Sequence, residues 1–185
     1  MKRRLFVWMC AVVLSVSPGL AGIGKGNGEI GFDFGATGFD SEVTGKSGFR
    51  LAFRGGYHFS KWFELEGESS ASVHVIQEGF YKDEADIVLS TIFVNGVLNF
   101  HSKSGNVVPY LLAGIGQARL DFRLANVDDT GAARQFAAGC RFFFGEHDQV
   151  AFRLQAGRVM EDTFDETSTH TNYVAGFTWR LGGGA

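Results

Sequence analysis

The amino-acid sequence predicts an all-β protein, an eight-stranded antiparallel transmembrane up-and-down β-barrel after an N-terminal signal peptide. Three observations predict this fold: stretches of about ten residues in which apolar and polar side chains alternate, a basic and then apolar start, and no later segment apolar enough for a spanning helix. Because every backbone amide in lipid must pair within the protein, such strands cross a bilayer only as a closed barrel.

The start of the chain has the features of an export signal. Lys2 to Arg4 are basic, Leu5 to Val16 form an apolar run, and Gly19 to Ala21 include small residues that suit cleavage. The run is shorter than the roughly eighteen residues of a spanning helix. We therefore expect a signal peptide at 1–21 and one barrel domain at 22–185, integral to a bacterial outer membrane.

Length and composition agree with a small barrel. Cleavage after Ala21 leaves 164 of the 185 residues, enough for eight strands and too few for a sixteen-stranded porin. The 26 glycines and only 2 prolines suit a curved, hydrogen-bonded sheet. Loss of the three basic residues of the signal takes the formal net charge from −3 to −6, which argues against a nucleic-acid partner.

The first four strands are each predicted by alternation. They are expected near Glu29–Phe39, Phe49–Phe59, Phe63–Ser70 and Val88–Phe100. The second is the clearest, because its apolar residues alternate with Arg50, Arg54 and His58. The lipid-facing residues of the four strands are predicted to be Ile30, Phe32, Phe34, Ala36, Phe49, Leu51, Phe53, Gly55, Tyr57, Phe59, Phe63, Leu65, Gly67, Ser69, Val88, Ile92, Val94, Leu98 and Phe100.

The last four strands are expected near Val108–Leu120, Phe136–Phe144, Val150–Gly157 and Asn172–Leu181. In the first of them both faces are apolar. Two sets compete for lipid there, and we expect the set Tyr110, Leu112, Gly114 and Gly116 rather than Leu111, Ala113 and Ile115. The other lipid-facing residues are predicted to be Phe136, Ala138, Cys140, Phe142, Phe144, Val150, Phe152, Leu154, Ala156, Tyr173, Ala175, Phe177, Trp179 and Leu181.

The connections alternate between long and short. Long ones are expected at 39–49, 75–87, 120–134 and 158–172, and tight turns at Ser60, at Ser102 to Asn106 and at Glu146. Outer-membrane barrels place short turns in the periplasm and long loops outside. We therefore expect periplasmic N- and C-termini, with Tyr81–Glu84 and Asp128–Gly131 outside the cell.

Charged residues on the inward faces are predicted to form an ionic network that fills the lumen. Its expected members are Arg50, Arg54, Glu64, Glu66, Glu68, Arg141 and Arg153. Arg54 and the glutamate row lie on neighbouring strands across one tight turn, within side-chain reach. Such a row also suits a proton or ion path or a paired-carboxylate catalytic site, but a narrow eight-stranded barrel needs its lumen filled, which favours a structural network.

Three segments carry a family resemblance. The run Val108–Gly116, the hairpin Phe59–Glu66 and the ending Gly176–Leu181 resemble the small outer-membrane β-barrel proteins of the OmpA-transmembrane and OmpX/Ail type. The resemblance implies that the last strand carries a signal for the barrel-assembly machinery, here Gly176, Trp179 and Leu181. Leu181 replaces the usual terminal aromatic residue, and residues 182–185 follow it. No peptidoglycan-binding domain follows, so a cell-wall tether is not implied.

The expected function is that of a non-enzymatic surface or structural protein, which serves adhesion or envelope integrity through four external loops. A lipid A-modifying enzyme and a narrow channel remain the alternatives. Ser70, Ser72 and His74 share a parity with Glu68, but they point inward, away from lipid. No catalytic or cofactor site is expected, and no metal site either, because His58, His101, His147 and His170 are scattered over strand ends and loops.

The expected partners are the lipid bilayer, lipopolysaccharide and, during insertion, the assembly machinery. An external ligand is not identified by the sequence. The outer face is predicted to be acidic, which would suit divalent cations that bridge lipopolysaccharide, although ordinary solvated loops have the same composition. The acidic residues are Asp40, Glu42, Asp83, Glu84, Asp128, Asp129, Glu161, Asp162, Asp165 and Glu166.

Overall fold

The described residues form eight antiparallel strands that close into one barrel, in which each strand pairs with the next and β1 pairs with β8. The computed structural model describes residues 28–40, 47–75, 85–100, 106–122, 126–144, 150–164 and 166–181. The strands are β1 (Gly28–Gly38), β2 (Ser47–His58), β3 (Phe63–Val75), β4 (Ala85–Asn99), β5 (Val107–Phe122), β6 (Val127–Phe144), β7 (Val150–Thr163) and β8 (Glu166–Leu181). This architecture confirms the predicted fold class.

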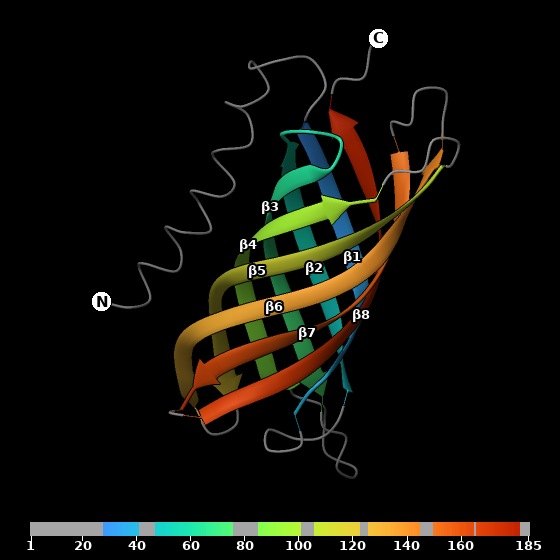
Figure 1. Cartoon of the computed structure of the whole chain (residues 1–185). Helices are drawn as coiled ribbons and strands as arrows, with labels where there is room; N and C mark the ends of the chain where they lie inside the picture. The colour runs from blue at the N-terminus through green and yellow to red at the C-terminus, as the bar shows by residue number, and fades with distance from the viewer. Residues whose placement is uncertain are drawn as a thin grey trace.

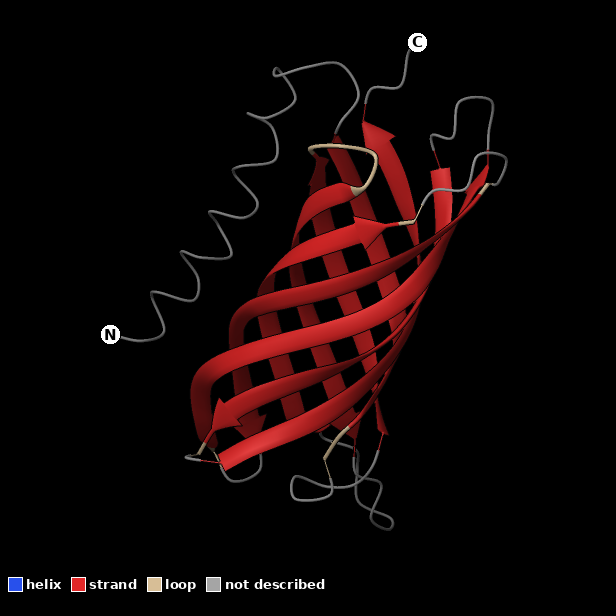
Figure 2. Ribbon diagram, in the orientation of Figure 1, coloured by secondary structure: helices blue, strands red, loops and turns tan. Residues whose placement is uncertain are grey.

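The barrel has two unlike ends. At one end, called the turn end, β1 begins and β8 finishes, with Gly28 opposite Leu181 (Figure 1, top). The opposite end, called the loop end, holds the connections from β1 to β2, β3 to β4, β5 to β6 and β7 to β8. Figure 2 shows the strong tilt of the strands around the barrel axis. Among the described residues, no helix is long and apolar enough to cross a membrane.

Alternation separates a lipid-facing surface from a filled lumen. Along β2, Phe49, Leu51 and Phe53 are exposed on the outside, whereas Arg50 and Arg54 are buried inside. The predicted facing is confirmed on the described parts of β1, β2, β3, β6, β7 and β8. On β4 it also holds, except that Ile92 is buried despite its outward parity.

The predicted facing of β5 was wrong. Tyr110 and Leu112 lie in the lumen, where only 1% of the Tyr110 surface is exposed, and Gly114 and Gly116 share their inward parity. Leu111 and Ile115 face outward, with 72% of Ile115 exposed. Inside the lumen Leu112 and Tyr110 pack with Val97 in a buried apolar cluster, so both faces of β5 are apolar and hydrophobicity alone did not separate them.

Two connections that were predicted to be long are short, because the strands continue beyond the predicted limits. The pairing of β5 with β6 runs to Phe122 opposite Val127, and that of β7 with β8 runs to Thr163 opposite Glu166. Barrel strands can extend past the apolar band, where both faces become polar and the alternation fades. The loops at 41–46 and 76–84, which include Tyr81–Glu84, lie outside the described residues, as do the expected signal peptide and the turn at Ser102.

The turn between β2 and β3 has a local cause. The Ser60 hydroxyl oxygen accepts hydrogen bonds from the backbone N–H groups of Trp62, at 3.2 Å, and Phe63, at 3.0 Å. Serine caps such turns because its side chain substitutes for a backbone acceptor. This tight turn sets β2 against β3 so that His58 is opposite Glu64 and Arg54 is opposite Glu68.

Candidate functional site

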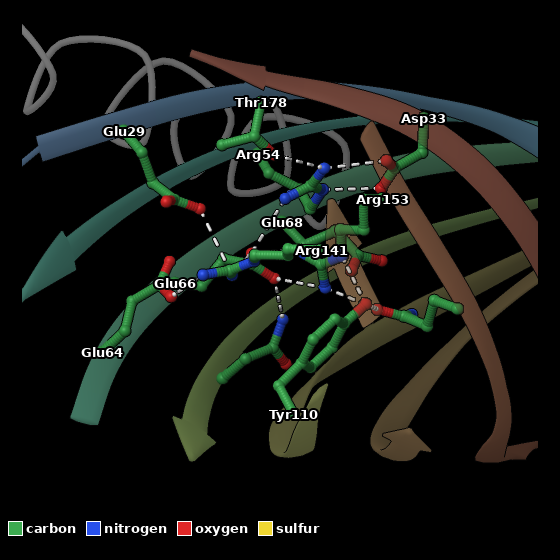
Figure 3. A network of polar contacts seen from close by, with 12 residues as sticks. Glu29, Asp33, Arg54, Glu64, Glu66, Glu68, Tyr110, Arg141, Arg153 and Thr178 are labelled. Carbon is green, nitrogen blue, oxygen red and sulfur yellow. Dashed lines mark hydrogen bonds and ion pairs between the residues drawn. The ribbon is translucent and has the colours of Figure 1, made fainter. Parts of the chain in front are cut away.

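The centre of the lumen is occupied by Glu66 between two guanidinium groups. Arg153 Nη1 lies 2.5 Å from Glu66 Oε2, and Arg54 Nη1 lies 3.1 Å from the same oxygen. All three side chains are almost wholly buried. Figure 3 shows them converging from β3, β7 and β2 across the barrel interior. Burial of a carboxylate costs desolvation energy, which its two cationic partners offset, and removal of either partner would leave an uncompensated charge in the lumen.

Arg54 also binds Asp33 on the neighbouring strand β1. Its Nε lies 2.5 Å from Asp33 Oδ2 and its Nη2 lies 2.8 Å from Asp33 Oδ1, a bidentate pair. Gly176, opposite Asp33 on β8, gives this carboxylate its room, since a Cβ there would collide with Asp33 Oδ1 and with the Phe32 carbonyl oxygen. Packing against Asp33 therefore requires a glycine at position 176, independently of any role in targeting.

Tyr110 joins the network from β5, and sequence reasoning missed it. Its hydroxyl accepts a hydrogen bond from Arg153 Nε at 2.5 Å and donates to Gln155 Oε1 at 2.9 Å. The guanidinium of Arg153 lies over the ring at 4.6 Å, and that of Arg141 at 5.1 Å. The inward parity of Gly114 and Gly116 was the available signal, because glycines face the lumen where side chains crowd.

A second ion pair lies toward the loop end. Arg50 Nη2 is 2.6 Å from Glu68 Oε1, and both side chains are buried. Gln135 on β6 donates hydrogen bonds to Glu68 Oε2 at 3.4 Å and to Asn95 Oδ1 at 2.6 Å. The side-chain amides of Gln135 and Asn95 thus connect this ion pair to β6 and β4.

A third cluster lies at the turn end. Arg141 Nη1 is 2.8 Å from Glu64 Oε2, and Arg141 Nη2 is 3.3 Å from Glu29 Oε1. His58 Nε2 is 2.8 Å from Glu29 Oε2 and 3.7 Å from Glu64 Oε2. Asn99 contributes from β4 by accepting a hydrogen bond from Arg141 Nη1 at 3.3 Å. Together the three clusters draw side chains from all eight strands, including Thr178 of β8, which accepts from Arg54 Nη2 at 3.3 Å.

The structure places every residue of the expected lumen network inside the barrel and gives each an ion pair. Those residues are Arg50, Arg54, Glu64, Glu66, Glu68, Arg141 and Arg153. Of the expected assembly-signal residues, Trp179 and Leu181 are exposed toward lipid, while Gly176 faces the lumen. The Trp179 ring lies 6.2 Å from that of Phe177, part of an outer aromatic surface.

The loop end of the lumen is closed by an apolar cluster. Its buried members are Phe39, Ile87, Leu89, Phe93, Ala118, Leu120, Ala133 and Val159. The His170 ring packs edge-to-face against the Phe39 ring, with centroids 5.4 Å apart, and its Nε2 lies 3.3 Å from Glu161 Oε1. Glu161, expected on the acidic outer face, is instead wholly buried on the inward face of β7, so that prediction was wrong.

The serines considered for an acyl-transfer site are engaged elsewhere. Ser70 Oγ lies 2.6 Å from Thr91 Oγ1, and Ser72 Oγ lies 2.7 Å from Thr37 Oγ1. His74 Nδ1 lies 2.8 Å from the Ser47 carbonyl oxygen, which makes this nitrogen the donor. Among the described contacts no serine hydroxyl is bonded to a histidine, which nucleophilic catalysis of this type requires.

Comparison with known proteins agrees with this geometry. The chain is similar in structure to Neisserial surface protein A (NspA), with a TM-score of 0.68 and 15% identity over 84% of this chain and 98% of that one. It is also similar to Ail, the attachment invasion locus protein of Yersinia pestis, with a TM-score of 0.53 and 16% identity over 85% and 99%. No curated protein matches the sequence.

The family assignment comes from the sequence itself. Residues 6–180 match the model of the outer membrane protein beta-barrel domain. The match spans most of the chain and includes all eight strands but the last residue of β8. With its closed barrel, apolar outer surface and filled lumen, the chain belongs to the outer membrane protein β-barrel family and is an integral protein of the outer membrane, as its strand pattern predicted.

Proposed function

We propose that this barrel is a non-enzymatic structural and surface-interaction protein, which acts through its loop end in adhesion or envelope integrity. The observation that carries the proposal is the double closure of the lumen. Buried ion pairs fill the middle and the turn end, and the apolar cluster around Phe93 and Leu120 fills the loop end. Because the described lumen is filled with side chains and no described serine hydroxyl contacts a histidine, we assign the function to the outer surface and the loops.

The proposed orientation places the loop end outside the cell and both termini in the periplasm, because short turns are periplasmic in such barrels. It includes removal of residues 1–21 as a signal peptide and insertion by the barrel-assembly machinery. The loop end carries an outward-facing hollow of about 560 Å³ between β6, β7 and β8. Its charged lining is Asp129, Arg134, Asp162 and Glu166.

This hollow suits lipopolysaccharide as the neighbouring surface. Arg134 Nη2 lies 3.9 Å from Asp162 Oδ2, and both side chains are largely exposed. A guanidinium can bind a lipid phosphate, while carboxylates can share a divalent cation with it. We therefore expect contact with the phosphorylated outer leaflet rather than chemistry on it.

The proposal is tested with a deletion strain and its complemented controls. Loss of the protein should raise sensitivity to detergent or serum or lower adhesion, and the wild-type gene should restore the phenotype. The complementing variant Ser70→Ala with His74→Gln should restore it as well. Lipid A mass spectra should be identical in all strains. A change in acylation that follows the Ser70 and His74 substitutions would instead support the enzyme.

A further inference from the structure

Three side chains with metal-binding groups converge at the turn end of the lumen. Glu29 comes from β1, His58 from β2 and Glu64 from β3, and one ligand atom of each lies within 4.8 Å of the others. His58 is directly opposite Glu64 across the β2–β3 pair. Glu29 is opposite Gly56, two residues before His58, so its side chain approaches on the diagonal. The cluster thus follows from the strand register and does not depend on a loop.

The distances between these groups suit a small metal ion. His58 Nε2 lies 2.8 Å from Glu29 Oε2 and 3.7 Å from Glu64 Oε2. Zinc ligands at bond lengths of 2.0–2.1 Å in a tetrahedral site lie about 3.3–3.5 Å apart. The two spacings, 2.8 and 3.7 Å, lie on either side of this value.

A carboxylate oxygen of this cluster has no hydrogen-bond partner among the described residues. Glu64 is fully buried, yet its Oε1 accepts no hydrogen bond. Such a buried acceptor is costly unless something else satisfies it. Figure 3 shows the carboxylates of Glu29 and Glu64 directed toward one another, with the Arg141 guanidinium beside them.

Gly56 keeps the space beside these carboxylates open. A Cβ at Gly56 would collide with Glu64 Oε1 and would lie 3.1 Å from Glu29 Cγ. Any other residue there would displace the free oxygen of Glu64. The space beside the Glu29 and Glu64 carboxylates therefore depends on a glycine at position 56.

Arg141 positions both carboxylates from the far side. Its Nη1 binds Glu64 Oε2 at 2.8 Å, and its Nη2 approaches Glu29 Oε1 at 3.3 Å. These contacts leave Glu64 Oε1 without a hydrogen bond, while Glu29 Oε2 faces His58 Nε2 at 2.8 Å. Groups that hold the outer oxygen of a metal-binding carboxylate fix its orientation in many metal sites.

We propose that Glu29, His58 and Glu64 bind one divalent transition-metal ion of the zinc class, with water as the fourth ligand. His58 is 13% exposed at the mouth of the barrel, which gives the ion its entry. An imidazole nitrogen among the ligands favours zinc over magnesium or calcium, which prefer oxygen alone. The ion would tie β1, β2 and β3 together at the turn end, independently of the loop-end function.

The test uses the protein purified from outer membranes in detergent and stripped with a chelator. Zinc chloride is titrated by calorimetry, and bound metal is counted by elemental analysis. We expect one zinc ion per barrel and a higher midpoint of thermal unfolding with zinc. His58→Gln should weaken binding at least tenfold, and Gly56→Ala should weaken it by displacing Glu64.

His74→Gln is the matched control, since this inward-facing histidine lies at the loop end and should keep full zinc binding. Folding of each variant is checked by its heat-dependent gel mobility, and His58→Asn replaces any variant that does not fold. Two results would overturn the proposal. Wild-type protein without stoichiometric zinc would leave His58 and Glu29 as a plain ion pair, and undiminished binding in both the His58 and Gly56 variants would place the ion elsewhere.

Discussion

Arg153 Nη1 and Glu66 Oε2 lie 2.5 Å apart in the middle of the barrel, and neither side chain has any exposed surface. The same carboxylate oxygen binds Arg54 at 3.1 Å, so one residue of β3 holds β2 and β7 together through the lumen. The strength of this contact is the basis for the first two predictions.

Glu66→Ala should lower the free energy of unfolding by about 3 kcal/mol, because it strands the guanidinium groups of Arg54 and Arg153 in a buried site. Urea unfolding in lipid vesicles, followed by tryptophan fluorescence, measures the loss. The control is Asp162→Ala, which breaks the pair with Arg134 at 3.9 Å, where the two side chains are 45% and 65% exposed. That change should cost at most about 0.5 kcal/mol. Equal losses in the two variants would contradict the structural importance of the buried pair.

Arg54→Met and Glu66→Gln together should cost less than the sum of the two single changes. The contact of 3.1 Å couples the residues, and contacting pairs commonly show about 0.5–3 kcal/mol of non-additivity. The same unfolding assay gives all four corners of the cycle. Arg54 with Glu161 is the control pair, since Glu161 binds His170 at the loop end and should give additive losses. Additivity for Arg54 and Glu66 would show that they do not interact.

The barrel should conduct little in planar lipid bilayers, and Arg50→Ala should not open it. Even without the Arg50–Glu68 pair, the apolar cluster around Phe93, Leu89 and Leu120 still closes the loop end. Single-channel recording at both polarities measures the current. Stable, ion-selective conductance of the wild-type protein would show that an open path exists and would revive the channel alternative.

An epitope inserted after Asp83, or between Leu124 and Ala125 in the β5–β6 connection, should be stained on intact cells. The second position precedes Asp128–Gly131, because the structure places those residues within β6, where an insertion would disturb strand pairing. An epitope at 103–105, between β4 and β5, should be stained only after permeabilisation. The reverse staining would overturn the proposed orientation of the barrel.

Trp179→Asp with Leu181→Asp should leave the protein unassembled, because both side chains are exposed toward lipid at the end of β8. Outer-membrane fractionation and protease resistance measure assembly. The conservative pair Trp179→Phe with Leu181→Phe should assemble normally. Gly176 is left unchanged, since a side chain there would collide with Asp33 and confuse folding with targeting. Normal levels of the aspartate variant in the outer membrane would refute the assembly role.

The fold was predictable because one face of each strand has to match lipid. On β2 the apolar Phe49, Leu51 and Phe53 alternate with Arg50 and Arg54. In a bilayer the apolar face of such a strand has to be the one toward lipid, so the facing of β2 could be assigned from sequence. On β5 the reading failed because the lumen is itself apolar around Leu112 and Val97, so both faces have the same hydrophobicity. Local pattern therefore predicts facing only where the lumen is polar.

The ion-pair partners were partly predictable from strand adjacency. Arg54 and Glu66 come from neighbouring strands joined by one turn, and the structure brings them into contact. Arg153 and Arg141 reach Glu66 and Glu64 across the barrel diameter, and Tyr110 completes the set from β5. Contacts across a lumen depend on barrel closure and strand tilt, which no single segment encodes.

The lumen network has a consequence for biogenesis. Each of its ion pairs joins side chains that are correct only for one alignment of the strands, and a one-residue slip of β2 would turn Arg50 and Arg54 out into lipid. An arginine facing hydrocarbon is heavily penalised. An incompletely closed sheet would likewise leave Glu66 without Arg153 from the other side of the barrel. Misaligned and incompletely closed barrels are therefore less stable than the native one. The buried charges thus favour the native alignment of the strands during assembly.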